Sequence, residues 1–143
     1  MTLPDALRAV VIGTGQMSLH ARGAHWNVTG PEFPATHAFF GDLYAQLDAA
    51  LDTLAEDLRT LDVLAPVDAS DYADGWRVEG EATDQRTALL NVLKADNDLL
   101  TTAIQTCYDV AEDKNECGIS NRMQDRLLAH AKIGWMLKAQ GAK

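Results

Sequence analysis

Apolar residues recur every three or four positions through most of this chain, which is the spacing that places them on one face of an α-helix. The pattern predicts four long helices: from about Leu3 to His25, from Phe33 to Leu61, from a cap at Thr83 to a turn at Asn115, and from Ser120 to Gln140. In the second helix the apolar stripe consists of Leu43, Leu47, Leu51, Leu54 and Leu58. We therefore expect an all-α protein whose helices bury these faces against one another.

Caps and helix breakers mark where the first two helices begin and end. Thr2 is placed to cap the first helix, Gly30-Pro31 breaks the chain after it, and Pro34 suits the first turn of the second helix. The Gly13-Thr14-Gly15 step weakens the first helix, but no strand precedes it as a phosphate-binding loop would require. We interpret this step as a site of close helix packing.

The connection between the second and third helices, from about Asp62 to Ala82, is long for two antiparallel neighbours. Inside it, the residues from Ser70 to Trp76 predict a short helix with Ser70 as its cap. The whole chain, residues 1–143, is therefore expected to form a single domain. Its architecture would be a four-helix bundle with one long crossover that carries a short extra helix.

Charge and composition narrow the function. The 143 residues have a formal net charge of -9, which is not the basic footprint of a general nucleic-acid binder and suits a protein that attracts metal cations. No apolar run approaches the roughly 20 residues that a membrane span needs, and the first residues lack the pattern of a signal peptide. We expect a cytoplasmic protein without membrane partners, in which Cys107 and Cys117 are reduced thiols.

Candidate metal ligands share one face of the second predicted helix. Steps of three and four residues place on that face, in order, His37, Gly41, Tyr44, Asp48, Asp52 and Glu56. Stacked acids without a cation between them are also typical of a solvated helix face. The histidine on the same stripe, with His25 just before the turn, indicates instead the imidazole and carboxylate set that binds iron.

The pattern of histidines excludes two familiar metal sites. A di-iron centre inside one bundle needs two Glu-x-x-His motifs, and the chain has none; the His-Glu-x-x-His motif of zinc proteases is absent too. The second helix could instead pack antiparallel on its own copy across a two-fold axis. If His37 then faces Glu56 of the mate, one subunit supplies imidazoles and the other carboxylates, with two equivalent sites per dimer.

Together these residues resemble the Dps family, the mini-ferritins named for DNA protection in starved cells. The resemblance spans nearly the whole chain and rests on the twelve-residue step from His25 to His37, Trp26-Asn27, Gly30-Pro31, Asp52-x-x-x-Glu56 and Lys132-x-x-Trp135-Met136-Leu137. It implies a ferritin-like four-helix bundle with a short extra helix in the long crossover between helices two and three. It also implies a homo-oligomer, a dodecameric shell built from two-fold dimers.

The resemblance further implies a ferroxidase that oxidises Fe(II) with hydrogen peroxide or oxygen at sites between subunits, stores the ferric product and so protects against oxidative damage. The ligands of that site would be His25, His37, Asp52 and Glu56. Trp26 would lie beside the site, although a lone tryptophan is also typical of a core. Iron is therefore the expected metal, and zinc is a candidate competitor for the imidazoles.

One position departs from the family pattern. Family members usually carry a carboxylate four residues after the second histidine, where this chain has Gly41; Asp42 is adjacent but points about 100° away around the helix. Two interpretations follow. The shell could keep its architecture with a degenerate metal site, or Asp48, one turn before Asp52, could compensate as a metal ligand, directly or through water.

Other charged and imidazole groups are assigned weaker roles. His20 and His130 lie on predicted helices and are expected to be packed or surface side chains rather than ligands. The acidic cluster Asp109, Glu112, Asp113 and Glu116 is either a solvated helix end or the mouth of an iron-entry pore. Nucleoid coating is the alternative function, but Lys138 and Lys143 are a small basic footprint against the charge of -9, so DNA binding is expected to be weak or absent.

Overall fold

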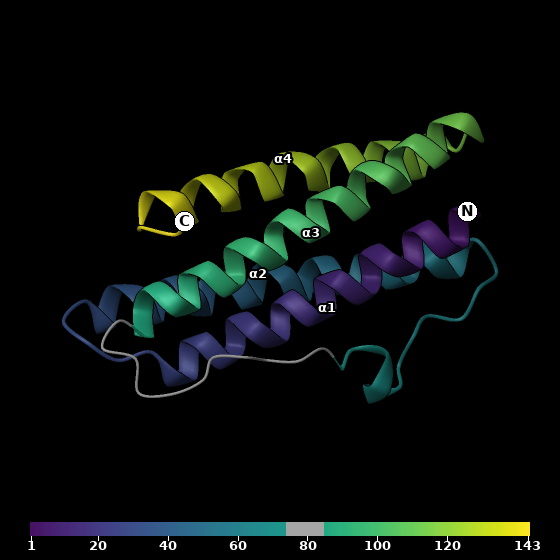
Figure 1. Cartoon of the computed structure of the whole chain (residues 1–143). Coiled ribbons are helices and arrows are strands. Elements are labelled where there is room, and N and C mark those ends of the chain that lie inside the picture. The colour runs from purple at the N-terminus through teal and green to yellow at the C-terminus, as the bar shows by residue number, and fades with distance from the viewer. Residues whose placement is uncertain (74–84) are drawn as a thin grey trace.

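The structure is a computed structural model that describes residues 1–73 and 85–143, and four long helices account for most of them (Figure 1). The elements are α1 (Leu3–Asn27), α2 (Phe33–Thr60), the 3₁₀ turn η1 (Ala69–Asp71), α3 (Gln85–Asp113) and α4 (Cys117–Ala139). α2 and α3 run in the same direction, which is why the connection between them must be long. The described residues contain no strand, and the predicted all-α four-helix bundle with one long crossover is confirmed.

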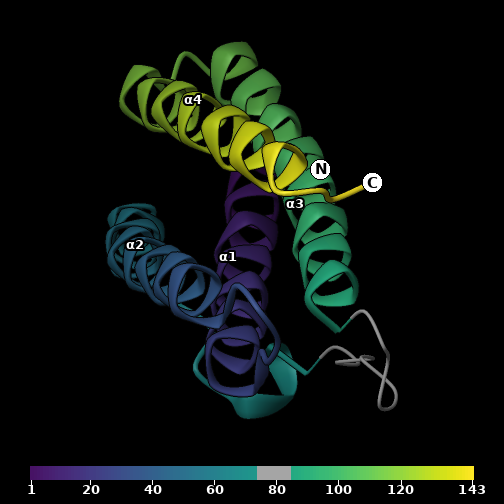
Figure 2. The same cartoon turned by 90° about the vertical axis from the view of Figure 1, so that its left-hand side faces the viewer.

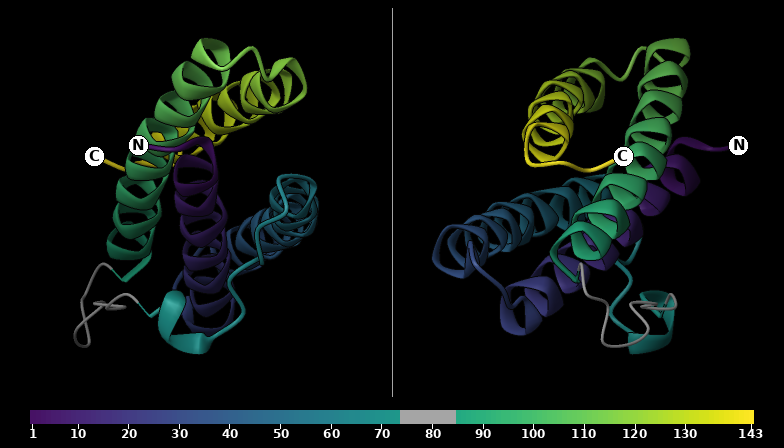
Figure 3. Two further views of the ribbon diagram at one scale, coloured as in Figure 1. Left: turned by 90° about the vertical axis from the view of Figure 1, so that its right-hand side faces the viewer. Right: turned by 60° about the vertical axis from the view of Figure 1, so that its left-hand side comes forward.

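The four helices are arranged around the α1–α3 pair. α1 packs against both α2 and α3, and α3 packs against α4. Viewed along the bundle, α2 and α4 lie on the same side of that pair (Figures 2 and 3). α2 therefore packs mainly against α1, and the ion pair between Asp57 and Arg122 also joins it to α4.

The predicted apolar stripe of α2 forms part of the core. Leu43, Leu47, Leu54 and Leu58 are buried, and Leu51 is partly buried against them. The other helices contribute large buried side chains, among them Leu7, Met17, Leu89, Leu93, Ile104, Met123 and Leu137. Burial of these apolar faces is the main force that holds the helices together.

The glycines of α1 let neighbouring elements come close to it. A Cβ on Gly13 would lie 2.9 Å from Cδ1 of Leu100, and a Cβ on Gly15 would lie 2.5 Å from Cε1 of Tyr72. This confirms the close packing expected for that step. The start of the crossover is also held to α1 by an ion pair of 2.9 Å between Arg8 and Asp71.

Most predicted ends of the long helices are correct to within two residues, and one, the start of α4, is wrong. Thr2 caps α1 by accepting a hydrogen bond from the backbone N–H of Asp5. α4 begins at Cys117 rather than at Ser120. Asn115, with a φ of 57°, turns the chain directly after α3, so Glu116 is already the N-cap residue of α4.

The short crossover helix differs in its cap and its type. It is a 3₁₀ turn capped by Asp68, whose carboxylate accepts from the N–H of Ser70, so the predicted cap at Ser70 is wrong. The predicted helix ends early, at Asp71, because Tyr72 and Ala73 are not helical. Its last predicted residues, 74–76, and the predicted cap at Thr83 lie outside the described residues. Within the described part of the chain, no helix combines the length and the apolar character that spanning a bilayer requires.

Candidate metal centre

His25, near the end of α1, and His37, at the start of α2, lie face to face. Their ring centroids are 3.7 Å apart and the ring planes differ by 15°. Nδ1 of His25 lies 2.6 Å from the backbone oxygen of His37, and Nδ1 of His37 lies 2.6 Å from the backbone oxygen of His25. The turn between the helices thus brings the two predicted imidazole ligands together.

These two hydrogen bonds decide which nitrogen of each ring is free. A backbone carbonyl can only accept, so both Nδ1 atoms carry the proton and donate it. The lone pair of each neutral imidazole is then on Nε2, and neither Nε2 has a hydrogen-bond partner among the described residues. A hydrogen bond from the second nitrogen is how metal-binding histidines are normally oriented.

Gly41 lies one turn after His37, and the ring of His25 occupies the space in which a side chain would start. A Cβ on Gly41 would lie 2.9 Å from both Cε1 and Nδ1 of His25. A larger residue would therefore push the ring away from its present position. The glycine at the position where the Dps pattern has a carboxylate therefore leaves room for the imidazole of His25 in this chain.

A row of side chains behind His25 connects it to Asp48. The ring of Tyr44 meets that of His25 edge-on, with centroids 5.5 Å apart, and Cζ of Arg22 lies 5.0 Å from the centroid of Tyr44. Nη2 of Arg22 donates to Asp48 at 2.6 Å, and the hydroxyl of Ser18 donates to the second carboxylate oxygen. The sequence did not predict this role of Arg22, whose only distinguishing feature is its position three residues before His25 on α1.

Asp52 and Glu56 lie on the other half of α2. Both are exposed, and neither forms an ion pair or a side-chain hydrogen bond within the described residues. Fifteen residues separate His37 from Asp52, which corresponds to roughly 22 Å along a helix. Across residues 1–73 and 85–143 of one subunit, no three His, Cys, Asp or Glu side chains lie close enough to hold a metal ion. One chain therefore brings the imidazoles together and keeps the carboxylates apart from them.

Comparison with known proteins assigns the family. The family model of the ferritin-like domain matches residues 5–143. The chain belongs to the ferritin-like family. The Dps protein of Vibrio cholerae O1, which is described as a member of a broad superfamily of ferritin-like diiron-carboxylate proteins, has a similar structure with a TM-score of 0.87. It is 28% identical, and the match covers 96% of this chain and 87% of that one.

Two further relatives point to the same branch of the ferritin-like family. The structure of antigen TpF1 from Treponema pallidum gives a TM-score of 0.88 at 26% identity, covering 96% of this chain and 90% of that one. The DNA protection during starvation protein of Brevibacillus brevis is 29% identical over 119 residues, which are 80% of this chain and 78% of that protein. The resemblance to the Dps family is thereby confirmed.

Aromatic side chains border the histidine pair of this Dps-type chain. The ring of Phe33 stacks on His37 with centroids 4.9 Å apart. Trp26 follows His25 directly and is 67% exposed, so the interpretation of Trp26 as a core residue is wrong. It lies on the outer side of the last turn of α1, next to the candidate centre in sequence.

The other two histidines are packed inside the bundle, as expected. Nδ1 of His20 lies 2.6 Å from a carboxylate oxygen of Asp96. His130 is fully buried, with Nδ1 at 2.8 Å from Oδ1 of Asn97 and Nε2 at 3.0 Å from Nη2 of Arg126. Burial, and secondarily the nearby Arg126, lowers the pKa of His130 to about 3, so its ring is neutral at pH 7.

The acidic cluster at the end of α3 is exposed on the subunit. Glu112 accepts a hydrogen bond from the hydroxyl of Ser120, and Asp109 accepts one from Gln105 at 3.0 Å. Asp113 lies 3.9 Å from Nζ of Lys114. The bond between Ser120 and Glu112 joins α4 to the end of α3, and all four acidic residues of the cluster are exposed.

Proposed function

We propose that this protein is an iron-oxidising and iron-storing mini-ferritin whose ferroxidase sites form between two subunits. Each site takes His25 and His37 from one subunit and Asp52 and Glu56 from the other. The subunits pair through antiparallel copies of α2, and the dimers assemble into a closed shell, which in the Dps family has twelve subunits. Membership of the ferritin-like family supports iron handling in general.

The observation that carries the proposal is the reciprocal clamp between His25 and His37. It fixes both rings in the tautomer with a free Nε2, and two such nitrogens on neighbouring rings are half of a four-ligand set for iron. The other half must come from carboxylates, and those of Asp52 and Glu56 are exposed and unpaired within the described residues. Because roughly 22 Å of helix separates the two halves, a two-fold axis is the simplest way to join them.

The proposal gives Asp48 a supporting role. Its two oxygens already accept from Arg22 and Ser18. Arg22 lies over Tyr44, and Tyr44 lies against His25. In the proposed site this row holds the His25 ring from behind, so the missing carboxylate at Gly41 is not replaced by Asp48 as a direct ligand.

The proposed reaction balances without a radical product. Two Fe(II) ions give one electron each to one hydrogen peroxide molecule, which takes up two protons, breaks its O–O bond and leaves as two waters. The two Fe(III) ions then move to storage as ferric oxide. Zinc is expected to compete because neutral imidazole binds it well.

The test is complementation between two inactive variants. His37→Ala lacks an imidazole and Asp52→Ala lacks a carboxylate, so each alone should oxidise Fe(II) no faster than a protein-free control after a peroxide pulse. In a mixed dimer, the site formed by His25 and His37 of the second variant and the carboxylates of the first is intact. Random reassembly of equal amounts from denaturant should restore about a quarter of the wild-type sites.

The control is Asp42→Ala, which removes an exposed carboxylate that lies on the same helix but away from the stripe. It should keep the wild-type rate and the wild-type assembly by size-exclusion chromatography. Two inactive parents whose mixture stays inactive would refute a site shared between subunits. A wild-type protein that oxidises no Fe(II) above the protein-free rate would refute the ferroxidase function itself.

A further inference from the structure

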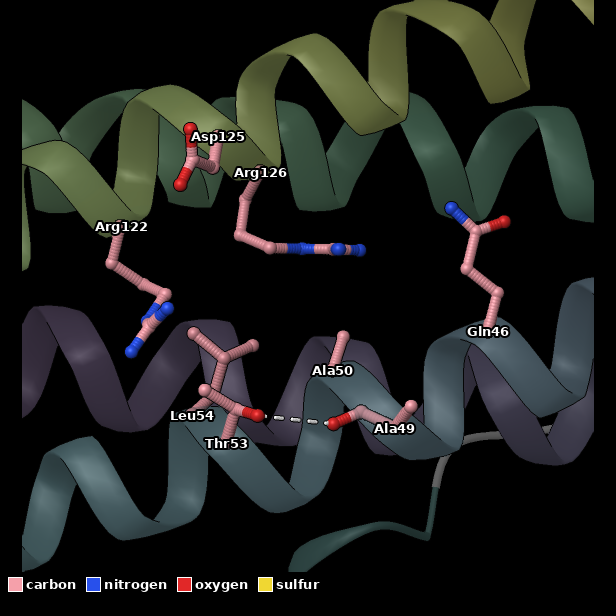
Figure 4. A pocket seen from close by; sticks show the side chains of 8 residues that line it. All are labelled: Gln46, Ala49, Ala50, Thr53, Leu54, Arg122, Asp125 and Arg126. Atoms are coloured by element: carbon pink, nitrogen blue, oxygen red, sulfur yellow. Dashed lines mark hydrogen bonds between the residues drawn. The ribbon is translucent and has the colours of Figure 1, made fainter.

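A cavity of about 300 Å³ lies between α2 and α4, away from the histidine pair (Figure 4). On the α2 side it is lined by mostly small, uncharged side chains, those of Gln46, Ala49, Ala50, Thr53 and Leu54. Its α4 wall carries charge and consists of Arg122, Asp125 and Arg126. None of these residues belongs to the candidate metal centre.

The two arginines differ in their partners. Arg122 is held by Asp57 of α2, with Nε at 2.6 Å and Nη2 at 3.3 Å from its carboxylate oxygens. Arg126, one turn later, has no carboxylate within ion-pair distance among the described residues. Its Nη2 lies 3.0 Å from Nε2 of His130, and its Nε is buried without a hydrogen-bond partner in the described part of the chain.

The guanidinium of Arg126 is therefore partly buried and lacks some of its hydrogen-bond and ion-pair partners among the described residues. Burial lowers the pKa of the Arg126 guanidinium, and only Asp125 opposes that effect. A buried N–H without an acceptor, and a buried charge without a counter-ion, each cost free energy. Since the neutral His130 can only accept from Arg126 at Nε2, it orients the guanidinium and leaves its charge unbalanced.

The orientation of the side chains makes the cavity suitable for an anion. Arg122 and Arg126 extend from α4 toward α2, whereas the carboxylate of Asp125 lies back against α4 (Figure 4). The guanidinium of Arg126 lies between the two helices and points toward the side on which Gln46 stands. An acceptor oxygen in the cavity would lie closer to the N–H groups of the arginines than to the carboxylate of Asp125. Guanidinium groups match phosphate oxygens in both geometry and charge.

We infer that this α2–α4 cavity is a phosphate site, in which Arg126 holds the phosphate group and Gln46 faces it from α2. The volume of about 300 Å³ is ample for inorganic phosphate and for a small phosphate monoester. The shared chemistry is a tetrahedral dianion. This inference does not depend on the ferroxidase proposal, because it uses none of the same residues.

The test is equilibrium dialysis of metal-free assembled protein with radiolabelled inorganic phosphate at constant ionic strength in chloride. We expect saturable binding of one phosphate per subunit. Glycerol 3-phosphate as competitor distinguishes the sources: displacement at equal concentration indicates a monoester site, and much weaker displacement indicates a site for the free ion. Either result supports the inference.

Three variants make the result specific. Arg126→Gln should weaken phosphate binding at least tenfold. Gln46→Glu, on the exposed α2 wall, puts a carboxylate of nearly the same shape opposite Arg126 and should abolish binding while raising the melting temperature in phosphate-free buffer. Lys132→Gln removes an exposed charge from the same helix outside the cavity and should change nothing.

The Gln46→Glu variant keeps the test decisive if Arg126→Gln does not fold. Unchanged phosphate binding in Gln46→Glu would overturn the inference. Equal losses in Lys132→Gln and Arg126→Gln would also overturn it, because they would indicate diffuse charge attraction. Absence of saturable binding in the wild type would overturn it as well.

Discussion

Each of His25 and His37 donates its Nδ1 proton to the backbone oxygen of the other, at 2.6 Å in both directions. Because His25 stands near the end of α1 and His37 near the start of α2, the same two hydrogen bonds join the helices and orient the rings. Loss of either ring leaves a carbonyl and an Nδ1–H without their partner. The geometry of the candidate ligands and the geometry of the turn are therefore coupled.

Gly41→Ala should slow iron oxidation while leaving the fold intact. The new Cβ would lie 2.9 Å from the His25 ring and displace it, and disturbing the support of a metal-binding histidine typically costs about 10- to 100-fold. Alanine gains about 1 kcal/mol of helix propensity over glycine, which offsets the local clash. The stopped-flow rate of ferric formation and the melting temperature measure the two effects separately.

Gly41→Asp extends the same test to the family's usual carboxylate. If position 41 were only a lost ligand, aspartate there would raise the rate above wild type. We expect it to lower the rate as Gly41→Ala does, because both share the Cβ that meets His25. Ala45→Ser, an exposed change one turn later, is the control and should have no effect.

The helices could be predicted from the sequence because local rules decide them. The leucine stripe of α2 follows the 3.6-residue period, and Thr2 caps α1 with its own side chain. The start of α4 was predicted three residues late, at Ser120, because serine favours helix N-termini. The positive φ of Asn115 turns the chain earlier, and the helix begins at Cys117. Such turn conformations depend on packing that a single sequence does not display.

The candidate site divides in the same way. The residue pattern and the resemblance to the Dps family pointed to His25 and His37, and the structure brings them together. The fit between Gly41 and the His25 ring, and the contact of Arg22 with Tyr44, depend on how α1 and α2 pack side by side. No periodicity within one helix reports contacts between two helices, so these features became visible only in three dimensions.

Asp48→Asn should leave the number of bound metal ions unchanged. The carboxylate of Asp48 is engaged by Arg22 and Ser18, and its side chain is 42% exposed. Loss of such a partly exposed pair should cost less than about 1 kcal/mol of stability. Anaerobic Fe(II) titration of wild type and variant measures the stoichiometry, and the loss of a bound ion per subunit would show that Asp48 is a direct ligand.

Cys107 should resist alkylation in the folded protein. Burial raises the pKa of its thiol to about 11, so at pH 8 roughly one molecule in a thousand carries the reactive thiolate. Cys117 is exposed and would be alkylated, so the experiment uses the Cys117→Ser variant, in which Cys107 is the remaining cysteine. Native Cys117→Ser treated with iodoacetamide should gain no mass by mass spectrometry until denaturant is added; rapid native labelling would show that the core around Cys107 opens readily.

His130 should make the protein less stable as pH falls below about 6.5. Its pKa is about 3 in the folded chain and near 6.5 when unfolded, so between these values the unfolded chain binds a proton that the folded chain does not. The stability from the neutral ring is complete above pH 6.5 and is lost as pH decreases, by about 2 kcal/mol between pH 7.5 and 5. His130→Gln keeps a polar group near Asn97 without titrating in this range.

Urea unfolding of wild type and His130→Gln at fixed concentration measures the effect. The difference in unfolding free energy, wild type minus variant, should shrink by that amount between pH 7.5 and 5. Parallel pH profiles would mean that the buried network opens and lets the ring take up a proton in the folded state.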